Sequence, residues 1–167
     1  MSRLATLFLA AAVLTGGAML AAPAFAVGNE DEPLETASNP DYDNAVRAVK
    51  RENYRDAIGY LTRVLSDDPK NADALNYMGF SHRKLGDFKN AIAFYTDALS
   101  VDPDHRGANE YLGEAYLEIN DLPNAETRLA HLRTICDSDC DEFFVLSAAV
   151  RAYKSGRKPS QSSRRRW

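Results

Sequence analysis

A spacing of 34 residues recurs through the middle of the chain and restricts it to a repeat architecture. Three kinds of position keep this spacing: a polar residue suited to begin a helix, the aromatic residue or leucine that follows it, and a small alanine three residues later. They are Asn53, Asp87 and Asp121; Tyr54, Phe88 and Leu122; and Ala57, Ala91 and Ala125. Each unit contains two amphipathic runs that cannot bury their apolar faces alone, so the units are predicted to stack as an all-α protein.

The stretch 72–105 shows this pattern most completely. Its two amphipathic runs are separated by a Leu-Gly-Asp-Phe segment and closed by Asp102-Pro103. Small residues stand where the two helices would touch, among them Gly79 and Ala98. Shifting the pattern in either direction predicts units at 38–71 and 106–139.

A two-helix unit of this length resembles the tetratricopeptide repeat, whose pattern is W-x2-L-G-x2-Y, then A-x3-F, then P. The central unit matches it with Leu75-x2-Met78-Gly79-x2-His82, then Ala91-x3-Tyr95, then Pro103. The resemblance implies an α-solenoid of three helical hairpins over residues 38–154, with 140–154 as a C-terminal capping helix. It implies little about function, because such repeats serve many partners.

The resemblance also implies a binding surface, because in this family the first helix of each unit lines a concave groove. The positions carried over from the family are Tyr42, Val46, Val49 and Lys50; Asp73, Asn76, Phe80, Arg83 and Lys84; Glu110, Glu114, Leu117 and Glu118; and Phe144 and Arg151. We expect an exposed Phe80 beside Arg83 and Lys84, facing an acidic wall made by the three glutamates. An aromatic anchor between charges of both signs suits a protein or peptide ligand.

The alternative is that these charges only solvate the face and pair with one another. The groove also lacks the Lys/Asn set with which chaperone-tail-binding members of the family hold a C-terminal carboxylate. That particular ligand is therefore not expected.

The first 26 residues are predicted to be a secretory signal peptide rather than part of the fold. Arg3 precedes an apolar stretch that carries no charge, and Ala24-Phe25-Ala26 forms a small-x-small cleavage site. Cleavage after Ala26 predicts an exported protein, with the periplasm as its destination and no membrane span afterwards. An uncleaved membrane anchor is the alternative. Residues 27–37 are acidic and turn-rich, and are expected to be a flexible lead-in.

The other end of the chain is basic. Residues 155–167 carry Arg157, Lys158 and Arg164-Arg165-Arg166 among serines, with Trp167 as the one large apolar side chain. We expect a disordered tail, or alternatively one that touches anionic surfaces. The net charge of −4 is mild and predicts no nucleic-acid partner.

Cys136 and Cys140 are the two cysteines of the chain. In an exported protein this spacing predicts a disulfide, which would hold the capping helix. Haem attachment would need a histidine where Asp141 stands, and zinc would need two more ligands, for which His131 is the nearest candidate. A redox-active pair is the other alternative. The Cys-x3-Cys pattern and the aromatic-rich helix after it also resemble the ends of small exported bacterial members of the family.

No arrangement typical of catalysis is present in the sequence. The histidines at positions 82, 105 and 131 are scattered, and no Ser/His/Asp pattern or phosphate-binding glycine loop occurs. The chain is therefore predicted to be a non-enzymatic scaffold or assembly adaptor of the cell envelope, with no cofactor and no metal. A structural protein that self-associates through its end faces is the other class left open.

Overall fold

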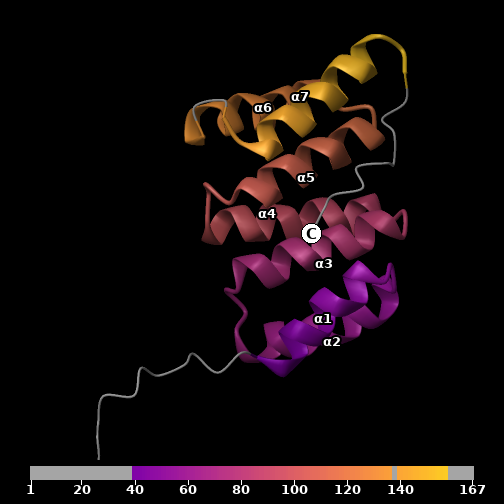
Figure 1. Ribbon diagram of the computed structural model, residues 1–167, viewed down its shortest axis with the longest axis vertical. Helices are drawn as coiled ribbons and strands as arrows, with labels where there is room; N and C mark the ends of the chain where they lie inside the picture. The colour runs from indigo at the N-terminus through magenta and orange to yellow at the C-terminus, as the bar shows by residue number, and fades with distance from the viewer. Residues whose placement is uncertain (1–38, 137–138, 158–167) are drawn as a thin grey trace, which may run out of the picture. The chain divides into compact units, whose positions relative to one another are not determined.

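A computed structural model describes residues 39–136 and 139–157 of the 167-residue chain. All regular secondary structure in these two ranges is helical (Figure 1). The helices are α1 (Pro40–Lys50), α2 (Tyr54–Asp67), α3 (Ala72–Lys84), α4 (Phe88–Val101), α5 (Arg106–Glu118), α6 (Leu122–Ile135) and α7 (Asp141–Lys154). The predicted all-α fold is confirmed.

Polar side chains begin most of these helices. The Asp87 carboxylate accepts a hydrogen bond from the Asn90 N–H at 3.2 Å, and Asp121 accepts one from the Asn124 N–H at 3.3 Å. Asn53 occupies the same register, but its carboxamide donates to Asp56 instead and makes no cap to the backbone. Asn53 is the N-cap of α2 as predicted, but its side chain bonds the carboxylate three residues on and not the backbone.

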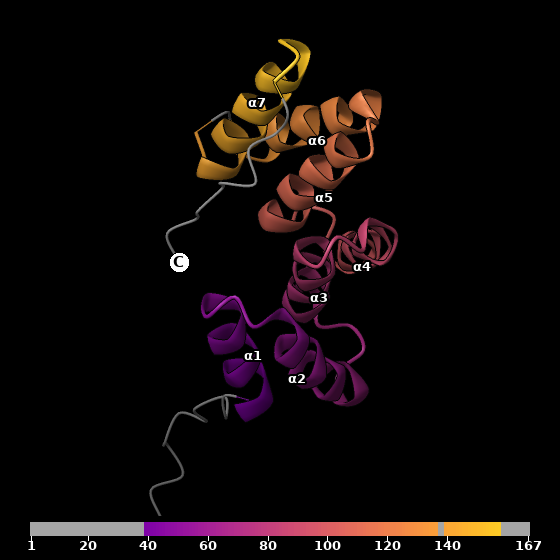
Figure 2. The ribbon, with the colours of Figure 1, turned by 90° about the vertical axis from the view of Figure 1, so that its right-hand side faces the viewer.

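The helices pair as the hairpins α1–α2, α3–α4 and α5–α6, and the second helix of each hairpin packs on the helix that follows. Contacts of α3 with α1 and α5, and of α5 with α7, place α1, α3, α5 and α7 in one layer, which we call the first-helix layer. Figure 2 shows α1 to the left of α2 and α3 to the left of α4, with α6 above α5. The last helix, α7, packs on both α5 and α6 and so caps the third hairpin.

Two glycines allow the closest helix contacts. A Cβ added to Gly79 on α3 would lie 2.7 Å from the ring of Tyr95 on α4. A Cβ added to Gly113 on α5 would lie 2.5 Å from a methyl group of Leu146 on α7. Because Cβ atoms do not approach other carbons this closely, both positions need a residue without a side chain.

The core runs along the stack between the two layers. The repeated alanines at 57, 91 and 125 are fully buried in it, as is Tyr95. Val49 and Leu117 also lie in the core, with exposed fractions of 2% and 1%. Both were expected on the ligand-binding face, and that expectation is wrong, because both side chains pack into the hydrophobic core.

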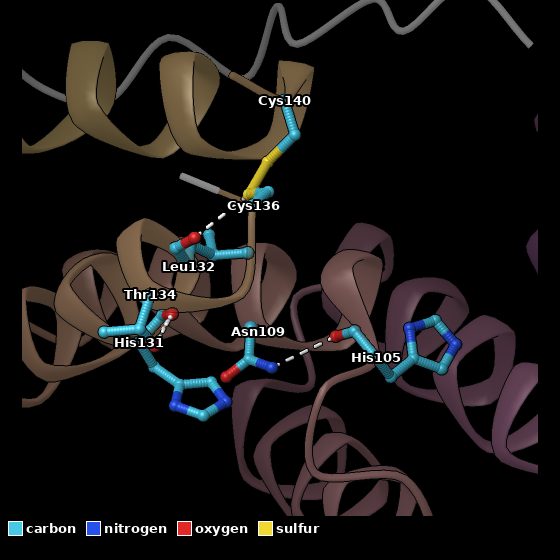
Figure 3. The surroundings of a disulfide bond; sticks show 7 residues. All are labelled: His105, Asn109, His131, Leu132, Thr134, Cys136 and Cys140. Carbon is cyan, nitrogen blue, oxygen red and sulfur yellow. Dashed lines mark hydrogen bonds between the residues drawn. A yellow bond between two sulfur atoms is a disulfide. The ribbon is translucent and has the colours of Figure 1, made fainter. Parts of the chain in front are cut away.

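A disulfide joins the end of α6 to the start of α7. The Sγ atoms of Cys136 and Cys140 are 2.10 Å apart (Figure 3). Cys136 is the residue after the last turn of α6, and Cys140 precedes the first turn of α7. The bond therefore ties the capping helix to the third hairpin across a very short loop.

The predicted signal peptide (1–26), the lead-in (27–37) and the tail beyond Arg157 lie outside the described residues. Across 39–136 and 139–157, no helix combines the length and the apolar character needed to cross a bilayer.

Candidate ligand-binding face

The centre of the first-helix layer holds a buried ion pair between α3 and α5. A terminal nitrogen of Arg83 lies 2.8 Å from Glu114 Oε2, and the two side chains are 8% and 9% exposed. Arg83 is in the last turn of α3, and Glu114 lies in the middle of α5. The pair links the central unit to the third unit through two charges removed from water.

Two aromatic rings that pack on each other lie beside the guanidinium group of Arg83. The Cζ atom of Arg83 lies 5.7 Å from the ring centroid of Phe80 and 5.5 Å from that of Tyr111, and the two ring centroids are 5.0 Å apart. A cation at this distance from ring faces gains cation–π stabilisation. We call Phe80, Arg83, Tyr111 and Glu114 the central cluster.

Phe80 is 5% exposed, so the expectation of an exposed aromatic anchor is wrong. Its ring packs on Tyr111 and makes an edge contact with Tyr54 on α2, at a centroid distance of 6.1 Å. Lys84 Nζ lies 5.2 Å from the same ring. Phe80 is therefore a packing residue of the face, and the half-buried Lys84 is the more accessible of the two.

The environment of the cluster favours a charged Arg83 and a neutral Tyr111. Burial by itself lowers the pKa of Arg83, but Tyr95 and Glu114 outweigh it, and the pKa is raised above its usual value. Burial raises the pKa of the Tyr111 hydroxyl, and the nearby Tyr95 and Glu114 raise it further. Arg83 is therefore a permanent cation in this cluster.

The predicted acidic wall is largely buried. Glu110 is fully buried, Glu114 belongs to the ion pair, and Glu118 is half-buried. The three glutamates are four residues apart on α5 and so lie on one side of that helix. They make this side of α5 rich in hydrogen-bond acceptors.

Asn76 adds another acceptor to the face. It is 6% exposed, and its Oδ1 atom has no hydrogen-bond partner within 39–136 and 139–157. Its Nδ2 atom lies 3.2 Å from where a Cβ of Gly107 would stand, so its carboxamide lies against the first turn of α5. Glu110 is one turn further along that helix.

The residues expected from the first unit lie apart from the central cluster. Tyr42 is half-buried and meets the ring of Tyr77 edge-on at 6.0 Å, Val46 is half-buried, and Lys50 is exposed. Asp73 accepts a hydrogen bond from His105. On the capping helix, Phe144 and Arg151 are exposed. The structure thus brings together Phe80, Arg83, Lys84 and Glu114, and leaves the first-unit and capping-helix positions at a distance along the stack.

Two aromatic residues of the face were missed. Tyr77 packs on Tyr42, and Tyr111 packs on Phe80 and Arg83. The two tyrosines are 34 residues apart, so the register that revealed the repeat would also have found them. They were missed because the family pattern does not mark this position.

Asn109 and two histidines hold the turn between the central and third units. The Asn109 carboxamide donates to the carbonyl oxygen of Pro103 at 3.0 Å. It also donates to that of His105 at 3.1 Å (Figure 3). His105 Nδ1 accepts from the Ala108 N–H, and His131 Nε2 lies 3.1 Å from the carbonyl oxygen of Pro103. These contacts give both histidines a structural role at this turn.

The described residues contain no group of His, Cys, Asp and Glu side chains that could hold a metal ion. Both cysteine sulfurs are joined to each other, and His131 contacts the turn before α5. The zinc alternative, which would need thiolate ligands, does not fit this arrangement.

Two family models described as tetratricopeptide repeat match the chain, at residues 42–99 and 82–135. Together they span more than half of the 167 residues and include all three hairpins. The chain belongs to the tetratricopeptide repeat family. Its resemblance to small exported bacterial members with a Cys-x3-Cys end stays a prediction.

Solved structures of the same fold include several peptide complexes. The TPR2B domain of yeast Sti1, in a complex with an Hsp70 ligand, is 18% identical, with a TM-score of 0.64 over 70% of this chain and 95% of that one. The first TPR of Spaghetti (RPAP3), bound to the HSP90 peptide SRMEEVD, is 16% identical, with a TM-score of 0.63 over 70% and 89%. The Yersinia enterocolitica type III secretion chaperone SycD, in complex with a peptide of the translocator YopD, is 20% identical, with a TM-score of 0.60 over 70% and 88%.

These identities establish likeness of fold alone. A search of curated protein sequences found no significant match to this chain.

Proposed function

We propose that this protein is a non-enzymatic scaffold or assembly adaptor that binds a protein or peptide through the α3–α5 part of its first-helix layer. The observation that carries the proposal is the composition of this face. Aromatic rings and a buried ion pair stand beside carboxylate and carboxamide acceptors. Rigid aromatic and arginine groups with polar groups around them are typical of protein-binding surfaces. The peptide complexes formed by proteins of the same fold support this function.

We further propose that the protein acts in the cell envelope, after export to the periplasm. The proposal rests on the signal-peptide pattern of residues 1–26 and on the disulfide, because disulfides persist in oxidising compartments. Fractionation of cells that express the tagged chain tests it. A chain in the cytoplasmic fraction with residues 1–26 still attached would contradict export.

The binding face is tested by site-specific crosslinking, because Phe80 and Arg83 are buried and their replacement would disturb the fold. A photoreactive amino acid is placed at Lys84, on the face, and in a matched variant at Lys89, an exposed residue of α4 in the other layer. We expect a defined protein partner to crosslink from position 84 and not from position 89. Equal crosslinking from both positions would refute this binding face.

A pair of charge variants extends the same test. Lys84→Ala with Glu118→Gln changes the face, and Lys89→Ala with Asp97→Asn makes the same changes at exposed residues of α4. The first pair should weaken binding of the crosslinked partner by about tenfold, and the second pair should leave it unchanged. Circular dichroism shows whether both variants remain folded.

A further inference from the structure

We propose that copies of this protein associate head to tail, with the start of α7 of one copy on a groove of exposed arginines on the α1–α2 hairpin of the next. The proposal goes beyond the α3–α5 face and does not depend on it. The two surfaces lie at opposite ends of the described stack, because α1 contacts α2 and α3, whereas α7 contacts α5 and α6 (Figure 1). Exposed charge, an exposed aromatic ring and this placement carry the proposal.

The first surface is a groove made of two adjoining hollows on α1 and α2. The hollows share Asp56 and Tyr60 among their lining residues. Four further lining residues are exposed arginines: Arg47, Arg51, Arg55 and Arg63. On each helix two of them are spaced four or eight residues apart, so their side chains lie on one side of that helix. We call this surface the arginine groove.

Most of the positive charge of the arginine groove is not neutralised within the described parts of the chain. Arg63 donates to both carboxylate oxygens of Asp41, at 2.8 and 2.7 Å. The other three arginines form no ion pair with any residue in 39–136 or 139–157. Asp56 is the one carboxylate among the described residues that line the hollows. The groove can therefore hold further carboxylates, as Arg63 already does.

The second surface is the exposed side of the first two turns of α7. Phe144 is 56% exposed, more than any other large apolar side chain of the described residues. No basic residue occurs between Cys140 and Arg151, and three acidic residues stand beside the ring in the sequence: Asp139, Asp141 and Glu142. None of the three forms an ion pair within 39–136 and 139–157. We call this surface the acidic end of α7.

An exposed phenylalanine is unusual at the end of a repeat stack. Terminal elements of repeat proteins carry a polar outer face, because no further repeat covers them. The ring of Phe144 stands on such a terminal helix and has acidic neighbours on one side. This combination indicates a contact surface for a basic partner that also offers apolar area.

The arginine groove has both properties. Arginine binds carboxylates through a planar fork of N–H donors, and the face of the guanidinium group stacks on aromatic rings. Tyr60 adds a ring on which Phe144 can pack. Because the arginines and Phe144 are exposed, the contact forms without opening either core. Arg151 is about 10 Å from Phe144 along α7, and its like charge keeps that half of the helix away from the groove.

A head-to-tail contact does not close on itself in a dimer. Each pair keeps one arginine groove and one acidic end of α7 unused, so further copies can add in the same way. Exposed ion pairs are individually weak and are screened by salt. We therefore expect association to grow with protein concentration and to weaken as salt is added.

Light scattering after size exclusion, and sedimentation equilibrium, measure this association on the purified chain. The average mass should rise above that of the monomer as the concentration is raised from micromolar to millimolar in low salt, and should return to the monomer value in high salt. A monomer mass at every concentration in low salt overturns the proposal.

A charge swap gives the decisive comparison. Arg51→Glu with Arg55→Glu reverses the groove, and Asp141→Lys with Glu142→Lys reverses the acidic end of α7. Each variant alone should associate at least about tenfold more weakly than the wild type, because like charges now meet. An equimolar mixture of the two should recover association as a one-to-one dimer, since the reversed surfaces match each other. A mixture that stays monomeric overturns the proposal.

Matched controls make the same changes elsewhere on the surface. Arg106→Glu with Arg133→Glu, at exposed residues of α5 and α6, should leave association unchanged. Phe144→Ser should weaken association while the protein remains folded by circular dichroism, because the side chain is exposed. An equal loss in the arginine control would mean that net charge acts and not the groove, and it would overturn the proposal.

Other modes of association give other results. Association that Phe144→Ser removes and the reversed groove does not means that two copies meet through α7. A poly-glutamate peptide that binds the groove of a protein that stays monomeric means an outside acidic ligand. Either result overturns the proposal. Crosslinking from position 84 tests a different face, so the proposed function and this association can fail independently.

Discussion

At the scale of single residues, Arg83 decides how the central and third units meet. Its guanidinium group lies beside the rings of Phe80 and Tyr111 and contacts a buried carboxylate on the next unit. Removing two charges from water is costly, and only good geometry and opposite charge offset that cost. The pair therefore specifies which helices meet more than it stabilises the fold.

Arg83→Met should destabilise the protein by about 3 kcal/mol, because it leaves the carboxylate of Glu114 buried without its partner. Glu114→Gln should also be costly. The double variant should lose less than the sum of the two single variants. Urea unfolding followed by circular dichroism measures all three.

Arg47→Met, at an exposed position on α1, is the control and should change the unfolding free energy by less than about 0.5 kcal/mol. Additive losses for the pair would show that Arg83 and Glu114 act independently.

At the scale of helices, one glycine is needed for two helices to pack closely, and another is not. Gly79 faces the ring of Tyr95 at a distance that no Cβ can share, whereas Gly59, on the exposed side of α2, has nothing within 4 Å. The same substitution at these two positions should therefore have opposite effects.

Gly79→Ala should destabilise the protein by about 1–3 kcal/mol, because the added methyl group pushes α3 away from α4. Gly59→Ala should stabilise it by about 0.5–1 kcal/mol, because alanine favours the helix and meets only solvent. Thermal unfolding of both variants checks the signs. Equal effects at the two sites would contradict the packing described for α3 and α4.

The disulfide acts at the same scale, by holding α7 against the third hairpin. Cys136→Ser with Cys140→Ser should lower the unfolding free energy by about 2 kcal/mol, the loop-entropy value for so short a ring. Reducing the wild-type protein should have the same effect. If reductant has no effect on the wild type while the variant is destabilised, the loss comes from the serines and not from the bond.

At the scale of the whole described stack, contacts between units make the repeats one cooperative structure. Besides the central cluster, Asp73 in the first turn of α3 accepts a hydrogen bond from His105, which begins α5. This hydrogen bond lowers the pKa of the Asp73 carboxyl below its usual value of 3.8, although burial opposes it. A carboxyl group with a lowered pKa stabilises the fold at pH values above its pKa in the unfolded chain. That stabilisation is lost as the pH falls through its pKa in the folded protein.

Asp73→Asn should therefore be less stable than wild type at about pH 6, by a few tenths of a kcal/mol, because the carboxylate is largely exposed. The difference should disappear as the pH falls below about 3.8. His105→Asn keeps a good helix-capping residue but breaks the link to Asp73, so it should flatten the pH dependence in the same way. Unfolding series at several pH values test this, and a difference that persists in acid would contradict the link.

The helices, their pairing and the family were all predictable from the amino-acid sequence. Caps and prolines act over a few neighbouring residues, and the 34-residue spacing is visible in the sequence itself. Both can therefore be recognised without knowing what lies across the stack. The same register placed Phe80, Arg83, Lys84 and Glu114 on the first-helix layer, where the structure brings them together.

Which of these residues reach solvent depends on contacts between helices, and the sequence pattern does not predict it. Phe80 is buried because rings from α2 and α5 pack on it, and Arg83 is buried because Glu114 lies across from it. Asn53 leaves the backbone uncapped because Asp56 attracts its side chain. Exposure and pairing depend on residues brought in from other helices, and the period of a repeat predicts where a side chain points but not what meets it there.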